Sequence, residues 1–332
     1  MITSSIPPCG DRQFSAKTRL KSRRELFLAI LTSGPCLRFR MKKTIKIFLV
    51  SLFLSTACGA FHASAAVPER ILSITPAGTE ILYELGLGDH VVGVTKYCSW
   101  PPEARTKPNM GDMMHVNLEV VMGTRPDIIL MSNMNNQAGE QIEALGYRTV
   151  TVYQDDFEQI CESMLRVGRE CGVEETAKRR IAELREAVRE KTVSLDGSPA
   201  RVLVVVGRDP LDEELRKIHV AGRDTFYDDL LMRAGAVNAY EQDVAYAQIS
   251  REGLIRIDPD VIIELIGEHG MEAPTEYIIS RWEAMSDLRA AQNGRVSVIK
   301  GDFTLRAGPR YPQILEAFIK AIRGGVREIF PD

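Results

Sequence analysis

Cysteine is scarce in this chain, and no cysteine stands in a pattern that forms a disulfide framework or a metal site. The 332 residues contain six cysteines and no C-x-x-C pair. Three lie within the first 58 residues, and the other three are Cys98, Cys161 and Cys171. This odd remainder argues against a disulfide framework and a zinc knuckle, and it predicts at least one free thiol.

Motifs of nucleotide binding and hydrolysis are also missing. Gly86-Leu87-Gly88 lacks the third glycine of a dinucleotide fingerprint, and the chain has no G-x-x-x-x-G-K, G-x-S-x-G or H-E-x-x-H sequence. No nucleophile and base can be identified. We therefore expect a protein that is not an enzyme and has no cofactor, although an exported α/β enzyme is the rival class.

Positive charge is confined to the start of the chain. The first 66 residues hold eleven Lys or Arg and two acids, a net charge of +9, whereas the whole chain carries −3. The remainder therefore carries −12 and has no basic stripe. Such a chain is a poor candidate for binding nucleic acid.

The basic front end has the composition of a targeting sequence. Met41 to Lys46 is a positive segment, Ile47 to Ala57 is apolar but short for a membrane span, and Ala63-Ser64-Ala65 is an A-x-A cleavage site. We predict an upstream extension at 1–40 and a signal peptide at 41–65. The mature protein is then exported, with a periplasmic location.

A lipid anchor is the alternative to a cleaved, soluble protein. Leu54-Ser55-Thr56-Ala57-Cys58 is similar to a lipobox with Cys58 as the lipidated residue, but Ser55 stands where leucine is usual. The mass of the mature N-terminus would decide between the two.

One long helix organises the rest of the chain. Val173 to Leu195 carries apolar residues at steps of three and four and charged residues elsewhere, and Asp196-Gly197-Ser198-Pro199 is expected to end it. Glu174 and Lys178, and Glu175 and Arg179, have the spacing of helical ion pairs. The helix is either a surface helix of one domain or a rigid strut between two lobes.

The residues before this helix alternate between strand and helix patterns, which predicts a parallel sheet. The long loop Lys96 to His115, at the end of a strand, is the expected binding segment. The expected strands are Ile71–Ile74, Val91–Thr95, Asp127–Met131 and Thr149–Val152, and the expected helices are Glu80–Leu85, Leu118–Gly123, Gln137–Leu145 and Asp156–Cys171.

The same alternation begins again after the long helix. We therefore expect an N-terminal α/β lobe at 66–172, a linking helix at 173–197 and a C-terminal α/β lobe at 198–332. The expected strands are Arg201–Val206, Asp260–Leu265 and Arg295–Ile299, and the expected helices are Thr225–Ala234, one around Leu254 and Ile255, Trp282–Ala291 and Pro312–Ile322.

The two halves share a short repeat. Glu119 stands eight residues before Asp127, and Glu252 stands eight residues before Asp260. Asn117 and Ser250 suit a helix N-cap, where an acid in the first turn is favoured by the helix dipole. A good helix start explains each glutamate alone, but it does not explain their matching places.

These stretches together resemble the substrate-binding proteins of ABC importers for cobalamin, haem and iron-siderophores, and the likeness is closest to the cobalamin-binding members. It covers residues 68 to 325. Its motifs are Arg70–Glu80, Val92–Thr95 with Tyr97, Trp100–Ala104, Asn117–Glu119 with Pro126-Asp127, Ile249–Glu252 and Arg306–Arg310.

The resemblance implies two Rossmann-like α/β lobes joined by a single long backbone helix, with the ligand between the lobes. It implies an ABC permease dimer with its ATPase subunits as the partner, and membrane contact only through the permease or a lipid anchor. Glu119 and Glu252 match the glutamates that dock such proteins to permease arginines, and two like acids suit a two-fold partner.

The resemblance also gives candidate ligand-binding residues. They are Tyr97, Trp100, Met113, Met114, Tyr246, Asp302, Phe303, Arg306 and Arg310. Aromatic rings and methionines suit a large flat macrocycle, but ordinary packing is the alternative for each of them. Arg310 could instead hold its loop in place.

Cobalamin is the expected ligand, with haem or a ferric siderophore as the alternative on the same fold. The methionines stand where the cobalamin-binding relative has an aromatic residue, and arginines facing acidic ligand groups would favour the alternative. His115, Cys98 and Met113 are residue types that can ligate a metal, but we expect no metal site in the protein.

Overall fold

The computed structural model describes residues 66–112, 116–133, 136–195, 197–208, 215–267, 274–324 and 328–329. The predicted extension at 1–40, the signal peptide at 41–65 and Cys58 lie outside these residues, as do Met113, Met114 and His115. Within them, no helix combines the length and the apolar composition needed to cross a membrane.

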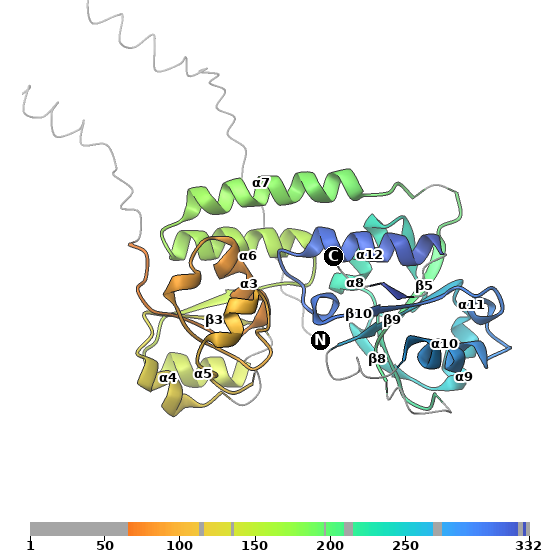
Figure 1. Ribbon diagram of the computed structural model, residues 1–332, viewed down its shortest axis with the longest axis horizontal. Coiled ribbons are helices and arrows are strands. Elements are labelled where there is room, and N and C mark those ends of the chain that lie inside the picture. Colours follow the sequence, from red (N-terminus) through yellow and green to blue (C-terminus); the bar gives the residue numbers. More distant parts are fainter. Residues whose placement is uncertain are drawn as a thin grey trace, which may run out of the picture. The chain divides into compact units, whose positions relative to one another are not determined.

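The first lobe is built on a four-stranded parallel sheet in the order β2-β1-β3-β4 (Figure 1). The predicted order of strands and α-helices is confirmed, but the predicted start of the first helix at Glu80 is wrong, because α3 already begins at Pro76. The elements are β1 Ile71–Ser73, α3 Pro76–Glu84, η1 Gly88–His90, β2 Val91–Val94, η2 Pro102–Thr106, α4 Leu118–Thr124, β3 Ile128–Ser132, α5 Asn136–Ala144, β4 Thr149–Val152 and α6 Phe157–Glu170.

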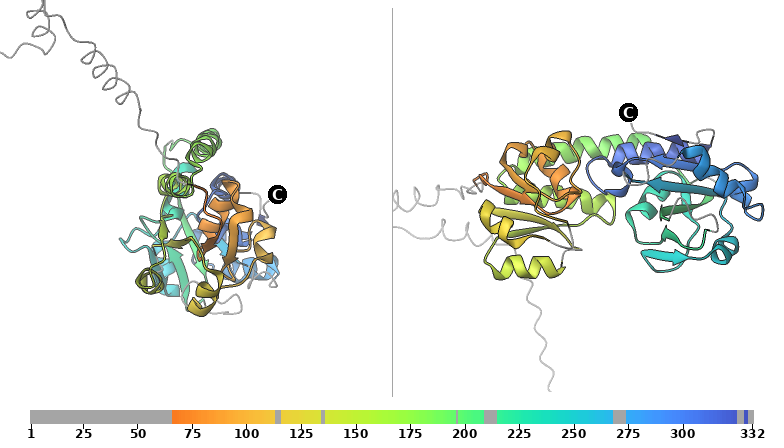
Figure 2. Two further views of the ribbon diagram at one scale, coloured as in Figure 1. Left: turned by 90° about the vertical axis from the view of Figure 1, so that its left-hand side faces the viewer. Right: turned by 60° about the horizontal axis from the view of Figure 1, so that its bottom comes forward.

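The second lobe is built on a separate, mixed sheet in the order β11-β10-β9-β5-β6-β8, and β7 also pairs with β5. The two sheets are seen apart in Figure 2. The elements are β5 Ala200–Gly207, β6 Ile218–Ala221, α8 Phe226–Arg233, β7 Ala236–Asn238, β8 Tyr246–Ile249, α9 Arg251–Ile257, β9 Val261–Ile266, α10 Thr275–Glu283, α11 Arg289–Gln292, β10 Val296–Lys300, η4 Asp302–Leu305, α12 Tyr311–Arg323 and β11 Glu328–Ile329.

The predicted helix Trp282–Ala291 is wrong. Trp282 is buried in the last turn of α10, and the chain breaks before α11 begins at Arg289. The backbone N–H of Arg289 donates to the Asp258 carboxylate at 3.0 Å. This contact from outside the segment fixes the start of α11, and local periodicity could not reveal it.

The long helix α7 runs from Glu174 to Lys191, so the predicted end at Leu195 is too late. Thr192 is extended, and the N–H of Val193 donates to the carbonyl oxygen of Arg233 at 2.8 Å. The pairing of this segment with the end of α8 replaces the last helical turn. At about 1.5 Å per residue α7 is therefore about 27 Å long.

Helix α7 joins the two lobes, which confirms the strut interpretation. It packs on α6 of the first lobe and on α12 of the second lobe (Figure 1). Arg180 forms an ion pair with Glu84 of α3, and Lys191 forms one with Glu316 of α12, at 2.6 Å. On its surface Glu174 pairs with Lys178 as predicted, whereas Arg179 pairs with Glu183.

One apolar cluster continues from the first sheet to the second. It includes Ile71 of β1, Ala177 and Ile181 of α7, Val204 of β5 and Phe318 of α12, all buried. Two smaller clusters lie on the other faces of the sheets. The chain thus has two sheets but one shared central core, since burial of these side chains does not stop at the lobe boundary.

The cysteines contribute to this core. Cys98, Cys161 and Cys171 are all buried, and none of them forms a disulfide. Burial raises the pKa of the Cys161 and Cys171 thiols to about 11, so neither has the low pKa of a reactive thiol.

The contact between α7 and α12 predicts a dependence of stability on pH. Hydrogen bonds from Lys191 and then Lys320 lower the pKa of the Glu316 carboxyl from 4.5 to about 2. A lowered folded-state pKa stabilises the protein above pH 4.5, and this contribution is lost as the pH falls toward 2. The melting temperature of Glu316→Gln should therefore fall less between pH 4.5 and pH 3 than that of the parent. The variant Glu190→Gln, at an exposed site of α7, should behave like the parent, and identical pH profiles for all three proteins would contradict the prediction.

Candidate functional site

Several candidate ligand residues follow the carboxyl ends of strands in both lobes, whereas Tyr246 is the first residue of β8 and Arg310 directly precedes α12. Tyr97 and Trp100 lie in the loop after β2, and Asp302, Phe303 and Arg306 follow β10. Parallel strands place their carboxyl ends at one edge of a sheet, which is where open α/β folds bind ligands. The loops after β2 and β10 also touch, because a terminal nitrogen of Arg306 donates to the hydroxyl oxygen of Ser99.

Arg306 is held by its own lobe as well as by the other. Its second terminal nitrogen donates to the Asp302 carboxylate at 2.7 Å, and both side chains are largely buried. Two neighbours thus fix the guanidinium group, one on each side of the lobe boundary. Its positive charge is balanced by a carboxylate of the same chain.

Arg310 forms a two-point contact across the lobes. Its Nε and Nη2 donate to the two carboxylate oxygens of Glu80 in α3, at 3.0 and 2.5 Å. The guanidinium carbon also lies 4.9 Å from the centre of the Trp100 ring. Burial raises the pKa of Glu80 above its ordinary value, against the opposing effect of Arg310. The guanidinium group of Arg310 is therefore bound by a residue of the protein itself.

The predicted aromatic residues fall into two groups. Tyr97, Trp100 and Tyr246 are 39%, 44% and 54% exposed, so their rings are presented to solvent. Phe303 is only 2% exposed and belongs to the central core cluster. The structure therefore brings three rings to the surface and places the fourth beneath the loop that carries Arg306.

The residue types suited to a metal do not assemble in the described part of the chain. Met110 and Cys98 are buried, and the Cys98 sulfur lies 3.2 Å from the Thr95 hydroxyl. Among the described residues, no three His, Cys, Asp or Glu side chains are placed to hold a metal ion. The roles of Met113, Met114 and His115 stay predictions, because these residues lie outside the described ranges.

Two further residues at strand ends were missed from the sequence. Asn133 directly follows β3, and Tyr153 directly follows β4 and is exposed. Both line a cavity of about 430 Å³, in which Arg166 lies over the Tyr153 ring. The rule that led to the loop Lys96 to His115, that residues after a parallel strand lie at the ligand-binding edge of the sheet, could have found both.

The repeat seen in the sequence is a repeat of geometry. Helices α4 and α9 each have seven residues, begin at a side-chain cap from Asn117 or Ser250, and end at a residue in the left-handed conformation. Glu119 and Glu252 occupy the first turns and are exposed. In Figure 1 both helices lie on the side of the protein away from α7.

The aspartates of the repeat explain its fixed spacing. Asp127 accepts a hydrogen bond from the backbone N–H of Arg70, and Asp260 accepts one from that of Arg201, each at 2.9 Å. Each aspartate thereby ties the start of its strand to the neighbouring strand, just after the short helix ends. The spacing from glutamate to aspartate is therefore set by the fold, and it places the two glutamates equivalently in the two lobes.

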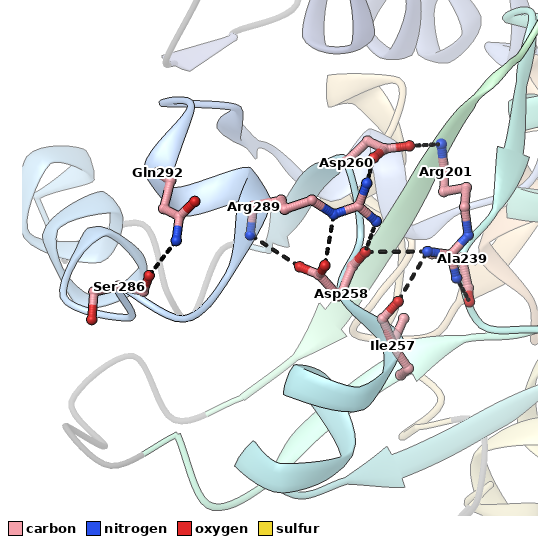
Figure 3. A network of polar contacts seen from close by, with 8 residues as sticks. All are labelled: Arg201, Ala239, Ile257, Asp258, Asp260, Ser286, Arg289 and Gln292. Atoms are coloured by element: carbon pink, nitrogen blue, oxygen red, sulfur yellow. Dashed lines mark hydrogen bonds and ion pairs between the residues drawn. The ribbon is translucent and has the colours of Figure 1, made fainter.

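In the second lobe additional contacts fix the end of α9 (Figure 3). Arg289 binds the Asp258 carboxylate at 2.6 Å and that of Asp260 at 2.9 Å. Arg201 donates to the carbonyl oxygen of Ile257 at 3.0 Å. This network ties the C-terminal end of α9 to β5 and to the start of α11.

Comparison with known proteins gives one family. Residues 71–303 match the model of the family described as periplasmic binding protein. This range includes both sheets apart from β11, and both short helices that carry the exposed glutamates.

Individual relatives agree with this match. The chain is 29% identical to an uncharacterized ABC transporter substrate-binding lipoprotein, YvrC, of Bacillus subtilis, covering 77% of this chain and 80% of that protein. It is 27% identical to the vitamin B12-binding protein of Photorhabdus laumondii, covering 78% and 88%. Among solved structures, the periplasmic heme-binding protein RhuT from Roseiflexus sp. RS-1 is 25% identical, with a TM-score of 0.65 and coverage of 76% and 97%.

Proposed function

Because the chain belongs to the periplasmic binding protein family, we propose that it binds cobalamin between its two lobes and delivers it unchanged to an ABC permease. At the coarser level, it is a substrate-binding protein of an ABC importer of the cobalamin, haem and siderophore type. Its relatives are solute-binding proteins and not enzymes.

The charge balance of the two arginines is the observation that carries the choice of ligand. Arg306 is paired with Asp302, and Arg310 is paired with Glu80. A haem or a carboxylate siderophore brings anionic groups, for which an unpaired guanidinium is the natural partner. Two arginines already neutralised by the protein favour a ligand whose rim consists of neutral amides, as that of cobalamin does.

The exposed rings support the same choice. Tyr97, Trp100 and Tyr246 offer apolar area together with polar edges, which suits a large macrocycle with a polar rim. We assign ligand contact to these rings and to Asp302 and Arg306, with Met113 and Met114 as further proposed contacts. Arg310 holds the loop, and buried Phe303 supports it from below.

The mode of delivery follows from the exposed acids. Glu119 and Glu252 are proposed to meet arginines of the permease dimer, whose ATPase subunits supply the energy for transport. The family match supports an extracytoplasmic location, and the relative YvrC is described as a lipoprotein. Periplasmic residence after cleavage at Ala65, or anchoring through Cys58, are the two forms of this proposal.

The ligand is tested by titrating the purified protein with cyanocobalamin, haemin and ferrichrome in calorimetry. Saturable one-to-one binding of cyanocobalamin, at least about tenfold tighter than that of the other two, is the expected result. If haemin binds most tightly, the ligand is haem and the proposal of cobalamin is wrong. If ferrichrome binds most tightly, the ligand is a siderophore. The absorption spectrum of bound haemin would then show whether the protein supplies an axial ligand.

Tyr246 provides a test of the ring contacts. The substitution Tyr246→Ala should weaken cyanocobalamin binding about tenfold, because a buried aromatic contact contributes about 1 to 2 kcal/mol to binding. Since the ring is half exposed in the protein without ligand, the melting temperature should change little. Val244→Ala, at an equally exposed position of the same segment, is the matched control. Equal affinities for both variants would remove Tyr246 from the site.

A further inference from the structure

A cavity of about 740 Å³ lies beside α7. Its walls come from α3, η2, α7 and the start of α12, and it includes neither Tyr97 nor Tyr246. It therefore differs from the strand-end site proposed above, although Trp100 and Arg310 border it. Its volume is in the range of small-molecule sites.

The cavity has an excess of negative charge. Five carboxylates line it and only two guanidinium groups oppose them. Arg180 is paired with Glu84 and Glu183, and Arg310 is paired with Glu80. Asp89 and Glu103 remain, and within the described residues neither forms an ion pair.

Apolar side chains also contribute to the walls of this cavity. Tyr83, Leu184 and Pro312 contribute to them, together with the exposed ring of Trp100. The Tyr83 hydroxyl is buried and has no hydrogen-bond partner. Burial, and then the nearby carboxylates of Glu103 and Asp89, raise the pKa of this phenol. The hydroxyl thus lies in a region of negative potential close to both unpaired acids.

We propose that this cavity is a second binding site, which takes a small aliphatic ammonium ion such as a diamine. Its charged ends would pair with Asp89 and Glu103, while its methylene chain would pack on Leu184 and Pro312 and on the aromatic rings. A bare metal ion is disfavoured, because no three acidic side chains of the described residues converge as metal ligands. A lining that contains both unpaired carboxylates and apolar side chains suits an aliphatic cation.

Calorimetric titration with putrescine, using 1,4-butanediol as the neutral molecule of similar length, tests the site on the purified protein. We expect putrescine to bind saturably and the diol to give no binding heat. The double variant Asp89→Asn, Glu103→Gln should weaken putrescine binding at least about tenfold. Both positions are exposed, so the variant should fold normally. Glu190→Gln removes an exposed acid of α7 outside the cavity and should bind putrescine as the parent does.

Absence of putrescine binding, equal binding of the diol, or unchanged affinity in the double variant would each overturn the proposal. If Glu190→Gln weakens putrescine binding as much as the double variant does, the effect is one of general surface charge, and the proposal is overturned as well. The same samples are titrated with cyanocobalamin, which should bind equally in all variants. Failure of the amine site and failure of the cobalamin site are thereby distinguished.

Discussion

The double variant Glu119→Ala, Glu252→Ala is expected to bind its ligand with unchanged affinity and to support no measurable uptake. The two side chains are exposed and occupy equivalent first turns of α4 and α9. Removing both eliminates the charges proposed to orient the protein on a two-fold permease. Uptake of radiolabelled cobalamin by cells that carry the cognate transporter measures the loss, and calorimetry measures the affinity.

Two other exposed acids give the matched control. Glu140 of α5 and Glu276 of α10 also lie on helices of the first and second lobes. Uptake by Glu140→Ala, Glu276→Ala should equal that of the parent, although the total charge changes by the same amount. If the Glu119, Glu252 variant transports normally, the permease must recognise another surface.

The largest effect on stability is expected for Glu264→Ala. Glu264 lies buried in β9, where Arg208 donates to its carboxylate at 3.0 Å and Trp282 Nε1 donates at 2.6 Å. Arg208 is equally buried. Removal of the Glu264 carboxylate leaves the buried Arg208 guanidinium without this partner. The expected loss is about 3 to 5 kcal/mol in the free energy of unfolding. Urea unfolding followed by circular dichroism measures this change.

Two companion variants show where the loss comes from. Trp282→Phe keeps most of the ring but removes one donor, and it should cost about 1 to 3 kcal/mol. Glu241→Ala removes an exposed acid of the same lobe and should change stability by less than about 0.5 kcal/mol. A loss below about 1 kcal/mol in Glu264→Ala would mean that the arginine finds other partners or water.

The sequence predicted those parts of the fold that local patterns control. Buried runs such as Ile128–Ser132, and caps such as Asn117, lie where the spacing of residues placed them. Errors arose where distant contacts decide. Val193 leaves the helix to pair with Arg233, and β6 and β8 are short antiparallel strands whose pairing depends on each other.

The candidate site divides in the same way. The rule for strand ends located the loop Lys96 to His115, the internal repeat located the paired glutamates, and resemblance located Tyr97 and Asp302. No sequence pattern showed that Arg310 is bound by Glu80, 230 residues away, or that Phe303 is turned into the core. Such facts depend on which surfaces the two lobes bring together, and they exist only in the folded chain.

The shared central core has a consequence for any attempt to divide the protein. Apolar side chains of β1, α7, β5 and α12 belong to one cluster. A fragment cut before or after α7 would therefore expose a large apolar surface to water. Neither half should be soluble when produced alone. Co-expression of the two fragments, by contrast, offers them each other's surface and should recover a nicked but ligand-competent molecule.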